Sequence, residues 1–181
     1  MRLAGHLAAL CLVVAAGCSP GGGTPADLPV GTEAGQAAPP LEGRLASGEP
    51  FSLAAERGAP VVLVFYRGAY CGLCRERLTR LQAHLAAYRA LGARVVAVSP
   101  DPPARSSELA ERLGLAFPLV SADSAVLARW AAGEGGDPLA LATTLLIGGD
   151  GVVLFAHRGR NAGDRATDAA LLTVLEQRRS E

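Results

Sequence analysis

The stretch VVLVFYRGAYCGLC, residues 61–74, is the part of the sequence on which the fold depends. It opens with a run of β-branched, aliphatic and aromatic residues, and a short apolar run of this kind predicts a strand buried on both faces. Gly68 follows, a residue that can adopt positive φ. Apolar residues then recur at spacings of three and four, which predicts a helix that continues to about residue 91 (Leu78, Leu81, Leu85 and Tyr88). Cys71 is therefore expected at the amino end of a helix, just past the carboxyl end of a buried strand.

This position favours thiolate chemistry. The first backbone N–H groups of a helix have no partner within the helix, and the helix dipole is positive at that end. Both effects stabilise an anion, so the Cys71 thiol should ionise more readily than a reference thiol with a pKa of about 8.5. Cys74 is expected about one turn further into the helix and less exposed.

The rest of the chain continues the alternation of strands and helices. Gly92 ends the first helix, and residues 94–98 form a second buried strand that pairs in parallel with residues 61–66 through a right-handed crossover. Gly148-Gly149-Asp150-Gly151 is typical of a hairpin turn. This order predicts an α/β sandwich with a mixed central sheet. Its expected strands are two within residues 39–54, then 61–66, 94–98, 117–120, 144–147 and 152–156, and its expected helices are 74–91, 104–113, 123–130 and 166–177.

Composition limits the possible partners. The chain has 181 residues, half of them hydrophobic, which suits a single domain with one core. Its formal net charge is zero, which argues against a nucleic-acid partner. All 17 basic residues are Arg, so a single Arg is weaker evidence for a site than usual.

The amino terminus predicts an envelope location. Residues 1–17 combine a positive start with an apolar stretch too short to span a bilayer of about 30 Å, and they resemble a bacterial lipoprotein signal peptide followed by a lipidated Cys18. The alternative is a plain secretory signal with an incidental cysteine. Residues 18–38 predict a disordered tether, and residues 39–181 the folded domain. We expect a domain that faces the periplasm and is held on the membrane by lipid, with Ser19 favouring the outer membrane.

One cysteine pair then remains in the mature domain, because Cys11 leaves with the signal. A disulfide between Cys71 and Cys74 closes almost no loop and stabilises little. A zinc site needs about four ligands, and the sequence offers no second cysteine pair, so no metal is expected. No glycine pattern for nucleotide binding follows the strands, so no bound cofactor is expected either. Redox chemistry is the remaining interpretation of the pair.

Several segments resemble the peroxiredoxin family (AhpC/TSA, redoxin) of the thioredoxin-fold superfamily. They are FYRG before Cys-X-X-Cys, VVAVSPDPPARSSELAERLGLAFPLV in the middle of the chain, and RGRNAGDRA near its end. The resemblance implies a thioredoxin-like three-layer sandwich and a thiol-dependent antioxidant oxidoreductase. Departures from the family also stand out: Gly68 and Val64 replace its Thr and Pro, Ala142 replaces an Arg on the hairpin strand, and Thr143 stands where thioredoxin-type reductases have a cis-proline.

The cysteine pair suits two reactions. With a peroxide, Cys71 thiolate takes oxygen to give a sulfenic acid, and Cys74 condenses with it to a disulfide. With a protein disulfide, Cys71 forms the mixed disulfide and Cys74 displaces the product. Both need an external thiol reductant, either thioredoxin-like or a membrane electron donor. We expect the peroxidase, with a periplasmic disulfide reductase as the alternative and a non-catalytic redox-sensing module as the second.

The supporting residues predicted around the pair rest on their nearness in sequence or on the expected register. Arg67 can lower the pKa of Cys71 or form a solvent-facing ion pair instead. Tyr66 and Tyr70 can shield the site or donate an O–H, with packing as their expected role. Thr143 and Thr144 line the pair if the thioredoxin register holds. Outside the site, Arg75 and Arg77 are expected on the exposed side of the helix and Trp130 in the core.

Overall fold

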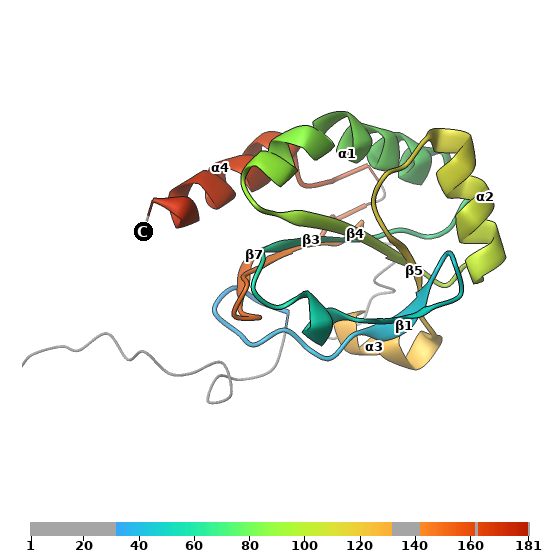
Figure 1. Ribbon diagram of the computed structural model, residues 1–181, viewed down its shortest axis with the longest axis horizontal. Coiled ribbons are helices and arrows are strands. Elements are labelled where there is room, and N and C mark those ends of the chain that lie inside the picture. The colour runs from blue at the N-terminus through green and yellow to red at the C-terminus, as the bar shows by residue number, and fades with distance from the viewer. Residues whose placement is uncertain (1–31, 132–141, 162, 181) are drawn as a thin grey trace, which may run out of the picture.

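The computed structural model describes residues 32–131, 142–161 and 163–180 (Figure 1). Their strands and helices follow one another in the predicted order. The strands are β1 (Glu42–Leu45), β2 (Pro50–Ser52), β3 (Val61–Phe65), β4 (Arg94–Ser99), β5 (Leu119–Ser121), β6 (Thr144–Ile147) and β7 (Val153–His157). The helices are the 3₁₀ helix η2 (Leu53–Glu56) and the α-helices α1 (Gly72–Ala90), α2 (Pro103–Leu113), α3 (Ser124–Ala131) and α4 (Asp168–Arg179).

All seven strands form one mixed sheet, in the order β2-β1-β5-β4-β3-β6-β7. β3 pairs in parallel with β4, and β4 with β5, whereas the outer pairs are antiparallel. The predicted strand–helix–strand unit is confirmed, since α1 connects β3 and β4, and Phe65 pairs with Val98 at the carboxyl ends of the two strands. The loops that follow these two strands therefore meet at the same edge of the sheet.

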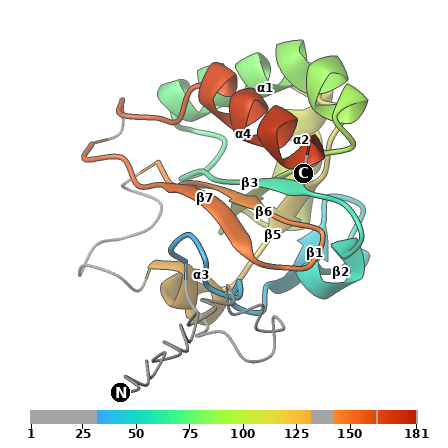
Figure 2. The same ribbon diagram turned by 90° about the vertical axis from the view of Figure 1, so that its left-hand side faces the viewer.

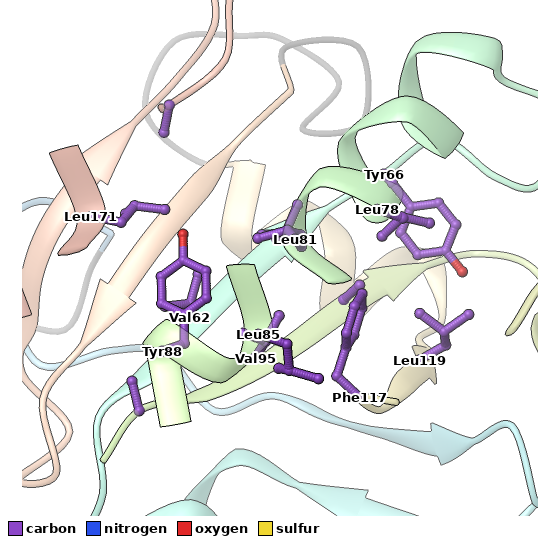
Figure 3. Close-up of a cluster of buried hydrophobic side chains, with 14 of the residues drawn as sticks. Val62, Tyr66, Leu78, Leu81, Leu85, Tyr88, Val95, Phe117, Leu119 and Leu171 are labelled. Carbon is purple, nitrogen blue, oxygen red and sulfur yellow. The ribbon is translucent and has the colours of Figure 1, made fainter. Parts of the chain in front are cut away.

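Helices cover the sheet on both faces, as expected for a three-layer sandwich. Figure 1 shows α1, α2 and α4 on one face and α3 on the other, and Figure 2 shows α4 beside α1 from the side. The side chains of β3 alternate between the two layers: Val62 and Val64 pack under α1, while Leu63 and Phe65 pack toward α3. Figure 3 shows the first of these cores, in which Leu78, Leu81 and Leu85 of α1 meet Val62, Val95 and Leu171.

The other core contains Trp130, as predicted. Its indole is 1% exposed, its ring lies 5.6 Å from that of Phe65, and its Nε1 donates to the carbonyl of Pro40 at 3.3 Å. A polar tip of this kind needs a partner when it is buried. The contact fixes α3 against the segment that leads into β1.

The packed chain begins earlier than the predicted boundary at residue 39. Ala37 forms a bridge with Val152, and the Gly35 amide donates to the carbonyl of Val153 at 2.8 Å. Thr32 is 2% exposed. The sequence predicts a tether here because the segment has no apolar period, but backbone hydrogen bonds to an edge strand require none. The predicted signal peptide and Cys18 lie outside the described residues.

Two predicted boundaries shift for local reasons. β5 begins at Leu119 rather than at residue 117, because Pro118 has no N–H for the ladder. The last helix begins at Asp168 rather than at residue 166, because the Thr167 hydroxyl caps it by accepting from the Ala170 amide at 3.2 Å. Among the described helices, none has the length and apolar character that crossing a bilayer requires.

Candidate active site

Cys71 lies at the N-cap of α1, six residues beyond the end of β3. Its backbone is extended (φ −81°, ψ 115°), its amide donates to the carbonyl of Gly68 at 3.1 Å, and its Sγ accepts from the Cys74 amide at 3.4 Å. A side-chain acceptor at this position satisfies one of the unpaired N–H groups of the first turn. The predicted place of Cys71 at the helix N-terminus is confirmed.

The loop before Cys71 is held by the loop that follows β4. Asp101 accepts the Ala69 amide through Oδ2 at 2.6 Å, and the backbone of Gly68 has a φ of +142°. A Cβ on Gly68 would lie 2.9 Å from Oδ1 of Asp101 and 2.9 Å from the ring of Tyr70. Neither the backbone conformation nor the space suits a branched side chain. The loop therefore does not accommodate at residue 68 the Thr that typical members of the family have there.

The two thiols have opposite electrostatic properties. Burial disfavours the charged form of Cys71, but hydrogen bonds from the thiol and the amide of Cys74, together with the charges of Arg165 and Arg67, outweigh it and lower the pKa of Cys71. Burial is also the largest influence on Cys74, which is 2% exposed, and with its hydrogen bond to Cys71 it raises the pKa of Cys74. Of the two thiols, Cys71 is therefore the one that ionises more readily, and it is the candidate nucleophile of the pair.

Arg165 is a residue of the candidate site that the sequence did not assign. Its Nη2 lies 3.8 Å from Sγ of Cys74; its charge helps to lower the pKa of Cys71, and its hydrogen bond to Cys74 opposes the rise in the pKa of that thiol. It lies in the loop between β7 and α4, 91 residues from Cys74. The segment RGRNAGDRA that contains it carries only a family resemblance. In a chain with 17 arginines and no lysine, nothing in the sequence separates this arginine from the others.

The sequence-predicted supporting residues lie at different distances from this chemistry. Arg67 is exposed, and its guanidinium lies 5.9 Å from the ring centroid of Tyr70. Tyr70 is 62% exposed, so the expected packing role is wrong for it; the ring lies against the backbone of Gly68 on the outside of the loop. Tyr66 is 1% exposed and packs in the core under α1, so for it the packing role holds, and burial raises the pKa of its hydroxyl.

Thr144 begins β6, the strand next to β3, and Thr143 directly precedes it. The Thr143 carbonyl accepts the Phe65 amide at 3.0 Å, and Thr144 pairs with Val64. Both residues are buried. Their backbones therefore fix the end of β3 from which the loop to Cys71 departs, while a direct role at the sulfurs stays a prediction.

Comparison with known proteins identifies the family. The sequence profile of the AhpC/TSA family matches residues 34–156, more than half of the chain. The chain belongs to the AhpC/TSA family. A Mycobacterium tuberculosis protein named "Putative peroxiredoxin Rv2521" is 35% identical over 88 residues, which are 48% of this chain and 56% of the relative. The chain thus spans little more than half the length of the curated relative it matches.

Solved structures give the fold of this AhpC/TSA protein. The crystal structure of peroxidoxin BcpB from Mycobacterium tuberculosis has a TM-score of 0.69 at 24% identity and covers 81% of this chain and 97% of its own. Peroxiredoxin Q of Xanthomonas campestris has a TM-score of 0.65 at 26% identity, over 76% of this chain and 90% of its own. The thioredoxin-like sandwich expected from the resemblance is confirmed.

The position of Arg77 in this AhpC/TSA chain differs from the one expected from the sequence. Arg77, predicted on the exposed side of α1, is 1% exposed and donates through Nη1 to Oδ2 of Asp168 at 2.7 Å. The Tyr88 hydroxyl donates to Oδ1 of the same carboxylate at 2.7 Å. Arg75, the other residue expected to be exposed, is half-buried and donates to the carbonyl of Ala69 at 2.9 Å. The Arg77 ion pair joins α1 to the start of α4 and so holds the loop that carries Arg165.

Proposed function

We propose that this protein is a thiol-dependent peroxidase that reduces hydroperoxides through Cys71 and Cys74. Family membership supports a cysteine-based oxidoreductase, and the opposite electrostatics of the two thiols support this use of the pair. A related Xanthomonas campestris protein, 25% identical, is described by an alkyl peroxide reduction activity. We therefore include organic hydroperoxides among the substrates.

The first step is attack by the Cys71 thiolate on the terminal oxygen of the hydroperoxide. An S–O bond forms, the O–O bond breaks, and the alkoxide leaves and takes up a proton, so that the products are the Cys71 sulfenic acid and an alcohol, or water from hydrogen peroxide. Negative charge moves from sulfur to the leaving oxygen in this step. The guanidinium of Arg165, beside the cysteine pair, can stabilise that charge in place of the family's missing arginine.

Cys74 then resolves the sulfenic acid. Its sulfur attacks Sγ of Cys71, a disulfide forms, and hydroxide leaves with the thiol proton as water. The two cysteines are one helical turn apart, and the Cys74 amide already lies 3.4 Å from Sγ of Cys71. An external dithiol restores the reduced pair by thiol–disulfide exchange, at Cys71 first because it is the more exposed sulfur.

Stopped-flow mixing of the reduced protein with hydrogen peroxide tests this function. We expect loss of both thiols in the wild type with formation of one disulfide, no thiol loss in Cys71→Ser, and accumulation of the Cys71 sulfenic acid in Cys74→Ser. Indifference of the wild type to hydrogen peroxide and to organic hydroperoxides, combined with rapid reduction of insulin disulfides, would instead assign a disulfide reductase.

We also propose that Cys18 carries the lipid that holds the domain on the membrane, facing the periplasm. The support comes from the sequence: an apolar stretch that ends in small residues directly before this cysteine. Expression of the full chain in a Gram-negative host with a radiolabelled fatty acid should label the wild type and not Cys18→Ser. Equal labelling of the two proteins, or recovery of the wild type in the soluble periplasmic fraction, would contradict the anchor.

A further inference from the structure

A polar groove adjoins the cysteine pair and has no role in the chemistry above. It has a volume of about 610 Å³ and is lined by the start of α1, the loop before it and α2. Figure 1 shows these two helices on the same face of the sheet. Its lining residues are Ala69, Tyr70, Arg75, Arg105, Glu108, Leu109 and Arg112. The lining thus contains three guanidinium groups and one carboxylate, a net positive charge.

The cations of the groove have few competing partners. Arg105 and Arg112 are exposed on α2 two helical turns apart, and neither forms an ion pair with any residue that the structure describes. Arg75 closes the end of the groove next to the active site, where its Nη1 donates to the carbonyl of Ala69. Guanidinium groups present parallel N–H donors that match a carboxylate.

The groove also has a fixed relation to the nucleophile. Tyr70 directly precedes Cys71 and Arg75 directly follows Cys74, so the loop that forms one wall of the groove is the loop that presents Cys71. A molecule whose anionic group lies against Arg105 and Arg112 would extend its other end over that loop. Hydrogen peroxide carries no anionic group, so a ligand of this groove that also reaches Cys71 would be a larger molecule.

We propose that this groove binds the carboxylate of a small organic co-substrate that reacts at Cys71. The proposal rests on the proposed peroxidase function and adds to it a preference for charge. Two co-substrates of that reaction can carry the carboxylate, namely the organic hydroperoxide and the thiol that reduces the disulfide. They react in separate half-reactions, and each can be measured alone.

The oxidative half-reaction is measured by single turnover of the reduced protein with 4-(2-hydroperoxypropan-2-yl)benzoate and with its methyl ester. The two probes share the reacting group and differ in one charge. In Arg105→Gln/Arg112→Gln, we expect the ratio of the acid rate to the ester rate to fall about three- to tenfold, the range that solvent-exposed ion pairs of this kind allow. The fall should shrink as ionic strength rises.

A matched control separates the groove from overall charge. The control variant Arg129→Gln/Arg179→Gln also removes two positive charges, but from exposed positions on α3 and at the end of α4. It should leave the ratio of the acid rate to the ester rate unchanged. The reductive half-reaction uses the oxidised protein with 3-mercaptopropionate and its methyl ester, for the same two variants. Each variant is normalised to its own rate with hydrogen peroxide.

The outcomes assign or refute the site. A fall of the ratio in the peroxide arm assigns an anionic hydroperoxide, and a fall in the thiol arm alone assigns an anionic thiol reductant. Equal ratios in wild type and groove variant in both arms would overturn the proposal while leaving the peroxidase intact. Failure of the wild type to react with hydrogen peroxide and with both hydroperoxides would refute the proposed function itself.

Discussion

The buried ion pair between Arg77 and Asp168 gives the strongest prediction about stability. The two side chains are 2% and 9% exposed, and their Nη1–Oδ2 distance is 2.7 Å. Within the described part of the chain, Nε and Nη2 of Arg77 have no hydrogen-bond partner. Asp168→Ala would therefore leave a whole guanidinium buried without a counter-charge, and would also remove the acceptor of the Tyr88 hydroxyl.

The expected cost follows from these contacts. Removing one partner of a buried ion pair costs about 3–5 kcal/mol, and we expect about 4 kcal/mol for Asp168→Ala. For a domain of this size, about 2–4 °C of Tm corresponds to each kcal/mol, so Tm should fall by about 8–16 °C. Tyr88→Phe, which removes only one hydrogen bond, should cost about 1 kcal/mol.

The double variant Arg77→Met/Asp168→Leu distinguishes a stranded charge from lost packing. It removes both charges and keeps apolar volume at the contact between α1 and α4. We expect it to be more stable than Asp168→Ala, because no unpaired ion stays buried. Urea unfolding of the reduced proteins at neutral pH measures each free energy. A cost below about 1 kcal/mol for Asp168→Ala, or a double variant less stable than it, would refute the assignment of a buried ion pair.

Three further predictions concern the cysteine loop. The pKa of Cys71 is lower in the folded than in the unfolded state, so its ionisation stabilises the fold, and this stability is lost as pH falls through the folded pKa. The wild type should therefore gain stability relative to Cys71→Ser as pH rises from the folded pKa toward about 8.5. Urea unfolding in a pH series measures this difference. Gly68→Ala should lower the free energy of unfolding by about 1–3 kcal/mol, because φ is +142° and the new Cβ would meet neighbouring atoms. Gly72→Ala is the control and should cost nothing, because the nearest atom to its Cβ is a side-chain nitrogen at 3.8 Å. Equal melting temperatures of the two variants would contradict this prediction. Arg165→Gln should raise the pKa of Cys71 in an alkylation-rate titration and slow its oxidation by hydrogen peroxide about tenfold, with an unchanged pH profile counting against its electrostatic role.

The fold could be predicted in detail because its signals are local. The apolar run of β3, the glycine that follows α1 and the hairpin turn before β7 each depend on a few adjacent residues. The parallel pairing of β3 with β4 followed from the short crossover through α1. The main misassignment, residues 32–38, concerns a segment held through backbone atoms, which leave no side-chain pattern.

The candidate site, too, could be predicted only where its residues lie close together in the sequence. The spacing of Cys71 and Cys74 at the start of a helix predicts where they lie. The positions of Arg165 and Arg77 depend instead on partners 91 residues away in the sequence. Their positions follow from how α4 lies against α1, which no periodicity encodes. The exposed place of Tyr70 has a similar cause, since the Asp101 loop fixes the turn that directs its ring outward.

The opposite pKa shifts of the two thiols arise from one turn of helix. Cys71 occupies the N-cap, so its sulfur accepts from the amide and the thiol of Cys74 and faces the unpaired N–H groups. Three residues later the same turn points inward, which buries Cys74 and keeps its proton available as the donor to Cys71. Arg165 acts in the same direction on both thiols, since its charge helps to lower the pKa of Cys71 and its hydrogen bond opposes the rise in the pKa of Cys74, so it does not set their order. Under the proposed mechanism, loss of Arg165 should slow the chemistry while Cys71 stays the more easily ionised thiol, whereas unwinding the first turn of α1 would remove the distinction between the two sulfurs.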